Sequence, residues 1–82
     1  MSEEIFQKVQ KIIAEKLGMK NLDGVTPEKS FTNDLGIDSL DREELMVEFE
    51  NVFEIKFSEE DAEKIDKVSD LVEYIESLLA SK

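Results

Sequence analysis

Apolar residues recur at helical spacing in three stretches of the chain, and the first runs from Glu3 to Leu17. Its apolar positions are Ile5, Phe6, Val9, Ile12, Ile13 and Leu17. Steps of three and four residues place these side chains on one face of an α-helix. Ser2 is a suitable N-cap, and Gly18 is a suitable C-terminal stop. We therefore predict a helix from Glu3 to Leu17.

The second helical stretch begins after Asp38 and continues to Phe53. Its apolar side chains share one arc that suits a core: Leu45, Met46, Phe49, Val52 and Phe53. Asp38 is a strong N-cap residue, and Asp41 stands where a capping box has its acid, usually Glu or Gln. With Asp38 as the cap, Ser39 is the first helical residue. Its hydroxyl is then not needed by a backbone amide and can face water.

The last part of the chain predicts a short helix followed by a long one. Ser58 and the acids after it form a helix start, with room for barely two turns before Ile65. We expect Asp66 or Ser69 to cap the last helix, whose apolar stripe is Val68, Leu71, Val72, Ile75, Leu78 and Leu79. No stretch has a strand pattern. The sequence therefore predicts an all-α four-helix bundle, with three longer helices and one short helix, in a single domain over residues 1–82.

A long connection, from Met19 to Asp38, separates the first two helices. It exceeds the usual loop length, which argues against a slack segment. We expect five apolar side chains to pin it across the bundle: Leu22, Val25, Phe31, Leu35 and Ile37. Gly36 permits a tight or left-handed turn just before Ser39.

The chain is short and strongly acidic. Its 82 residues leave no room for a catalytic cleft of ordinary size. It has 21 acidic and 10 basic residues, and eight of the acids with one base, Arg42, lie between Asp34 and Glu54. Such a field repels nucleic acid and anionic lipid, so we expect neither as a partner. It favours weak, salt-sensitive association with basic protein patches.

Several residue types that chemistry often needs are absent. The chain has no histidine and no cysteine, so Ser39 has no imidazole base and we do not expect an enzyme. Residues 33–44 have the length of a calcium loop, but Leu35 and Ile37 occupy ligand positions, so we expect no metal site.

No apolar run approaches the roughly 20 residues of a membrane span. The acidic amino terminus is unlike a signal peptide, so we expect a cytoplasmic protein. We also expect it to be a monomer.

One side of the second helix combines acids with two apolar residues. Leu40 and Val47, seven residues apart, lie opposite the core arc, beside Glu43, Glu50 and Asn51. Isolated surface apolar residues are ordinary, and the residues alone favour that interpretation. The alternative is a docking surface, acidic with a small apolar centre.

The run Asp38-Ser39-Leu40-Asp41, preceded by Asp34-Leu35-Gly36 and followed by Glu44-Leu45, resembles the attachment motif of acyl carrier proteins. The resemblance covers nearly the whole chain in order, length and acidity. In that family, the phosphate of 4′-phosphopantetheine esterifies the motif serine, and the thiol of this arm carries acyl groups as thioesters. The resemblance thus implies covalent 4′-phosphopantetheine, from coenzyme A, on Ser39, with Asp38, Leu40 and Asp41 flanking it.

The resemblance also implies partners, namely a phosphopantetheinyl transferase, acyl-processing enzymes and the acyl chains themselves. Leu40, Glu44 and Val47 occupy positions that resemble the family's docking residues, and we add Glu43 and Glu50 from the same acidic side. Fatty-acid members usually have valine where this chain has Glu43. The pathway is therefore open between fatty-acid or related lipid biosynthesis and a specialised polyketide, lipid A or peptide pathway. An acidic helical interaction module without prosthetic group is the alternative from another class.

Members of the family can shelter part of the acyl chain between helices. The residues that we expect as candidates for lining such a cleft are Phe31, Met46, Phe49, Phe53, Ile65 and Leu71. For each one alone, a place in the ordinary core is the simpler interpretation.

Overall fold

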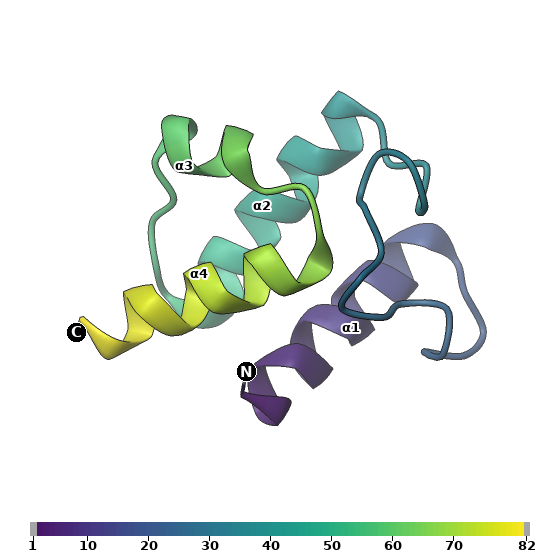
Figure 1. Ribbon diagram of the computed structural model, residues 1–82, viewed down its shortest axis with the longest axis horizontal. Coiled ribbons are helices and arrows are strands. Elements are labelled where there is room, and N and C mark those ends of the chain that lie inside the picture. The colour runs from purple at the N-terminus through teal and green to yellow at the C-terminus, as the bar shows by residue number, and fades with distance from the viewer. Residues whose placement is uncertain (1, 82) are drawn as a thin grey trace.

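Four α-helices make up the regular structure of residues 2–81, the part of the chain that the computed structural model describes (Figure 1). They are α1 (Glu3–Leu17), α2 (Ser39–Phe53), α3 (Glu59–Lys64) and α4 (Val68–Ala80). Within these residues there is no strand, and the single β-type pairing is an isolated bridge between Ser30 and Lys67. The predicted all-α fold, with three longer helices and one short helix, is confirmed.

The helix ends follow local capping chemistry. The Ser2 hydroxyl accepts a hydrogen bond from the Ile5 amide, and Gly18 ends α1 in the left-handed region at φ 70°. The prediction for α4 was wrong in detail, because the N-cap is Lys67. The Lys67 amide donates to a carboxylate oxygen of Asp70 at 3.1 Å. Asp66 accepts instead from the Ser30 hydroxyl, at 2.9 Å, so its side chain holds the loop rather than the helix.

The core lies where α1 packs against α4 and α2. Its buried helical side chains are Val9, Ile13, Ala14, Leu45, Met46, Phe49, Phe53, Val68, Leu71, Val72 and Ile75. The short helix α3 contributes no buried residue. Val52, which we predicted on the core arc, is 47% exposed. The buried stripe of α2 is narrower than that arc, so a residue at the arc's edge stays in solvent.

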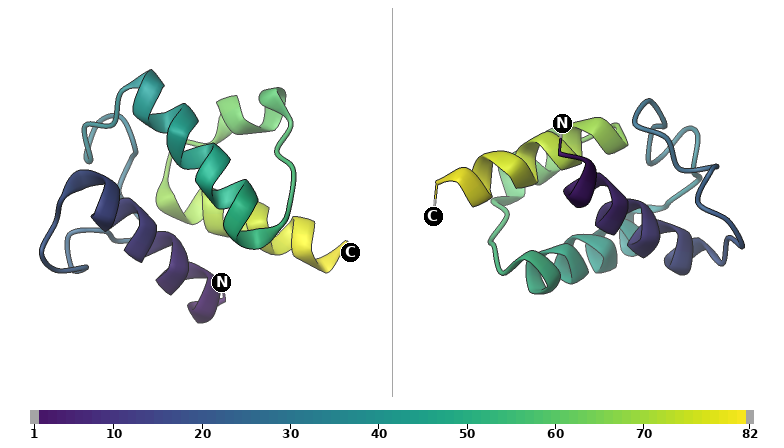
Figure 2. Two further views of the ribbon diagram at one scale, coloured as in Figure 1. Left: turned by 180° about the vertical axis from the view of Figure 1, so that it is seen from behind. Right: turned by 90° about the horizontal axis from the view of Figure 1, so that it is seen from below.

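The long connection between α1 and α2 folds over one end of the molecule (Figure 2). Val25, Phe31 and Ile37 are buried and Leu35 is half-buried, as the predicted pinning requires. The prediction for Leu22 was wrong, because its side chain is 38% exposed. A polar contact holds this turn instead: the side-chain nitrogen Nε2 of Gln10 donates to the Leu22 carbonyl at 2.8 Å.

Hydrogen bonds join this connection to the segment between α3 and α4. The Phe31 amide donates to the Asp66 carbonyl at 2.8 Å, and the Val68 amide donates to the Lys29 carbonyl at 3.0 Å. The Ile37 amide then donates to the Phe31 carbonyl at 2.8 Å. Because these bonds fix the chain as far as Ile37, the start of α2 is held in place by the rest of the fold.

Candidate functional site

Ser39 is the first residue of α2, and it is exposed. Gly36 turns the chain at φ 66°, in the left-handed region, as predicted. Asp38 is the N-cap, and its carboxylate accepts from the Asp41 amide at 2.8 Å. The Ser39 hydroxyl makes no hydrogen bond with any other residue of the described range 2–81. At the start of α3, by contrast, the Ser58 hydroxyl is itself the cap and accepts from the Asp61 amide.

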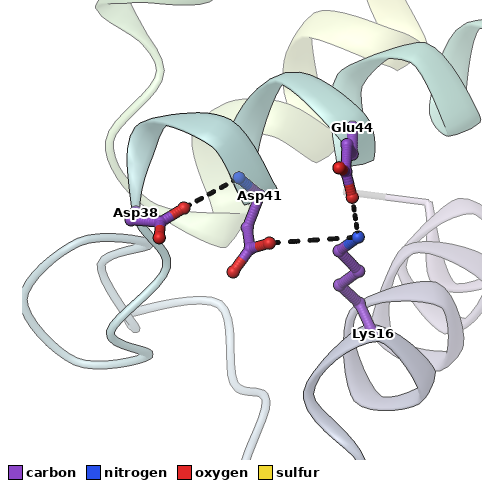
Figure 3. Close-up of polar contacts among 4 residues, drawn as sticks. All are labelled: Lys16, Asp38, Asp41 and Glu44. Carbon is purple, nitrogen blue, oxygen red and sulfur yellow. Dashed lines mark hydrogen bonds and ion pairs between the residues drawn. The ribbon is translucent and has the colours of Figure 1, made fainter.

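The side of α2 that faces α1 carries an ion-pair cluster (Figure 3). The Lys16 ammonium pairs with the Glu44 carboxylate and lies 4.0 Å from a carboxylate oxygen of Asp41. The hydrogen bond that Lys16 donates to Glu44, together with the negative charges of Glu44 and Asp41, raises the pKa of Lys16 above its ordinary value. Since the Asp41 carboxylate faces Lys16, it does not complete the capping box that its position suggested.

A groove of about 590 Å³ lies on the other side of α2, between α2 and α3, and Ser39 is on its edge. Its apolar wall consists of Met46, Val47, Phe57 and Ala62, and the carboxylates around it belong to Glu43, Glu50, Glu59 and Glu63. Of the six residues predicted to line a cleft, Met46 lines this groove. The other five, Phe31, Phe49, Phe53, Ile65 and Leu71, do not line it and are buried at 8% exposure or less. For these five the core interpretation is correct.

The residues predicted for docking fall into two groups. Val47, Glu43 and Glu50 share the groove with Ser39, whereas Leu40 and Glu44 lie outside it. Leu40 is 63% exposed and Val47 is 54% exposed, so both apolar side chains face solvent as predicted. Glu50 has a structural contact as well, because its carboxylate accepts from the Phe57 amide at 2.8 Å.

Two basic residues at this site were not singled out from the sequence. Lys16 pairs with α2 from 28 residues away, and Arg42 lines the groove and donates to the Ala62 and Ile65 carbonyls. Among the described residues we find no three potential ligands placed to hold a metal ion. None of the helices in this range has the length and apolar character needed to cross a bilayer.

Comparison with known proteins identifies the kind of site. A family model described as a phosphopantetheine attachment site matches residues 7–75. The chain belongs to this family. An acyl carrier protein from Thermotoga maritima is similar in structure, with a TM-score of 0.81 and 34% identity over 96% of this chain and 91% of that one. One from Enterococcus faecalis has a TM-score of 0.79 and 41% identity, over 93% of this chain and 95% of that one.

Membership of the acyl carrier family confirms the resemblance noted in the sequence. The protein is a carrier of acyl groups and not an enzyme, and its prosthetic group is phosphopantetheine. This decides against the alternative of an acidic interaction module without prosthetic group.

Proposed function

We propose that Ser39 carries the 4′-phosphopantetheine arm of this acyl carrier protein. The observation that carries the proposal is the position of Ser39, exposed at the first residue of α2 with its hydroxyl free of hydrogen bonds to residues 2–81. A modifying enzyme needs such a hydroxyl, reachable from solvent and held on a rigid helix. Residues 1–82 then act as one carrier domain, a monomer in the cytoplasm.

The surroundings of Ser39 suit covalent attachment better than tight binding of the phosphate. A phosphate at the start of a helix gains about 0.3–1 kcal/mol from the helix dipole. The carboxylates of Asp38 and Asp41 oppose this gain, since both lie within the first turn or its cap. We therefore expect the phosphopantetheine arm to be attached covalently at Ser39 without tight noncovalent binding of its phosphate. When bound, phosphopantetheine supplies the thiol that this chain lacks.

The partners that we propose are a phosphopantetheinyl transferase and acyl-processing enzymes with basic patches. Leu40 and Val47 give the exposed face of α2 a small apolar centre, and Glu43, Glu44 and Glu50 surround it with carboxylates. Electrostatic attraction to such a face accelerates encounter and weakens with salt.

The test is intact-mass analysis after incubation with coenzyme A and a phosphopantetheinyl transferase. We expect the wild type to gain the phosphopantetheine mass completely and Ser39→Ala to gain none while folding normally. Ser77→Ala is the matched control, because Ser77 is an exposed serine of α4. It should be modified like the wild type. Recovery of the added mass on Ser39→Ala would place the attachment elsewhere.

Fatty-acid or related lipid biosynthesis is the pathway we propose first, and one observation favours a specialised carrier instead. Glu43 is exposed on the groove edge next to Val47. A partner with an apolar pocket at this position would have to bury a carboxylate, at a cost of several kcal/mol if the charge stayed unpaired. A partner that offers arginine or lysine avoids this cost, so Glu43 would select between enzymes.

Comparing Glu43→Val with the wild type as substrates of a general fatty-acid condensing enzyme tests this second candidate. A specialised carrier should be elongated faster after the substitution. Glu48→Val, an exposed glutamate of α2 outside the groove, should behave like the wild type. If wild type and Glu43→Val are elongated at the same rate, Glu43 does not select partners and the specialised assignment loses its support.

A further inference from the structure

The short helix α3 is held to its neighbours by polar contacts. None of its residues is buried. At its C-terminal end, one guanidinium nitrogen of Arg42 donates to the carbonyls of Ala62 and Ile65. Before its N-terminal end, the Phe57 amide donates to Glu50 of α2. Arg42 and Glu50 therefore join α2 to the two ends of the α3 segment, and the groove lies between these joints.

Arg42 also lies at the boundary between the groove and the core. It lines the groove together with Ser39 and Met46. Its guanidinium carbon is also 5.9 Å from the centre of the ring of Phe31, a core residue that is 1% exposed and does not line the groove. An acyl chain that starts at Ser39 and moves from the groove toward Phe31 must therefore displace the Arg42 guanidinium from its two carbonyl partners.

We propose that Arg42 limits how deeply a thioester-linked acyl chain enters this protein, so that the chain stops in the outer groove against Met46 and Ala62. This proposal rests on Ser39 being the attachment residue. The limit is energetic: passing Arg42 leaves a charged donor and two carbonyls without their hydrogen bonds, and the buried methylenes must compensate for that loss. The cargo that the groove suits is short and uncharged, because four carboxylates surround it and would repel an anionic chain.

The experiment compares a short and a long cargo on the same carrier. Butyryl and decanoyl forms are made from the corresponding acyl coenzyme A with a phosphopantetheinyl transferase, and loading is checked by intact mass. Nuclear Overhauser contacts from the terminal methyl group of the cargo then report its position. The Met46 and Ala62 methyl groups report the outer groove, and the Phe31 ring reports the core behind Arg42.

In the wild type, we expect both cargoes to contact Met46 or Ala62 and neither to contact Phe31. In Arg42→Ala, the decanoyl methyl group should gain contacts to the Phe31 ring. Lys56→Ala is the control of equal charge change, since Lys56 is exposed and outside this groove, and it should match the wild type.

The outcomes separate this proposal from the assignment of Ser39. Added mass on Ser39→Ala refutes the attachment site before any contact is measured. A decanoyl contact to Phe31 in the loaded wild type overturns the role of Arg42. This measurement uses only the wild type, so it does not depend on whether a variant folds. A loaded, folded Arg42→Ala protein without that contact overturns it as well.

Discussion

Both sides of α2 carry acidic side chains, but among the residues that the structure describes only those on one side form ion pairs with a base. On the side facing α1, Lys16 pairs with Glu44 and Asp41. On the side facing α3, the groove is lined by Glu43 of α2 together with Glu59 and Glu63 of α3, and within residues 2–81 none of these three forms an ion pair. The base on that side, Arg42, donates to backbone carbonyls instead.

This difference shows that the acids of one segment can have different electrostatic surroundings once the chain is folded. Eight acids between Asp34 and Glu54 look alike in the sequence, yet Asp41 and Glu44 lie against Lys16. Glu43 and Glu50, by contrast, line the groove opposite the acids of α3. On the groove side, which also holds Ser39, the acids line the groove without an ion pair to any residue of the range 2–81. The α1 side contributes to holding the helices together.

The largest effect is expected from replacing the base on each side by methionine. Arg42→Met leaves the Ala62 and Ile65 carbonyls without a charged donor, which should lower the free energy of unfolding by about 1.5–3 kcal/mol. Lys16→Met should lower it less, because Lys16 pairs with carboxylates that remain accessible to water. Urea unfolding of both variants measures this. Equal losses in the free energy of unfolding would mean that Arg42, bonded to backbone carbonyls, stabilises the fold no more than Lys16 does through its ion pairs.

Removing one carboxylate from each side should change stability in opposite directions. Glu43→Gln relieves repulsion and should raise the free energy of unfolding, whereas Glu44→Gln removes the partner of Lys16 and should lower it. Each change is expected to be about 0.2–1 kcal/mol at low salt. Thermal or urea unfolding at low and moderate ionic strength gives both values.

Salt provides the control for this pair of variants. Both effects should shrink at about 0.1 M salt, where charges are screened beyond roughly 10 Å. The wild type itself should become more stable over that range, because repulsion exceeds attraction in a chain of formal charge −11. Changes of the same sign in the two variants would contradict the division of α2 into two sides.

Periodicity and capping were sufficient to predict the helices, because these signals lie within one or two turns of the chain. Ser2, Gly18 and Asp38 act as predicted. Val52 and Leu22 were wrongly placed in the core, because their burial depends on which distant element covers them. The end of α2 gave no local signal, since Glu54 adopts φ 56°, where glycine is more usual.

For the site, as for the fold, the local features could be predicted from the sequence and the contacts between distant residues could not. Ser39 and its flanking acids stand in one continuous motif, so the sequence alone identified them as candidates. The roles of Lys16 and Arg42 depend on contacts 28 and 20 residues away, with Glu44 and Ala62. In the sequence they are a lysine on a helix and a single base among acids. Their function appears only when the helices are packed.

The smallest expected effect concerns the charge of Lys16 at alkaline pH. Its pKa is raised in the folded state, so the ion pair stabilises the fold fully below the unfolded value of about 10.5. That contribution is lost as the pH rises through the higher folded value. The stability difference between wild type and Lys16→Met should therefore be constant at neutral pH and decline above about pH 10.5. Urea unfolding across this range measures it.

Lys56→Met, at an exposed lysine without an ion pair in the described part of the chain, should show no such decline. A difference for Lys16→Met that persists at high pH would show that the Lys16 side chain stabilises α1 against α2 by packing and not by its charge.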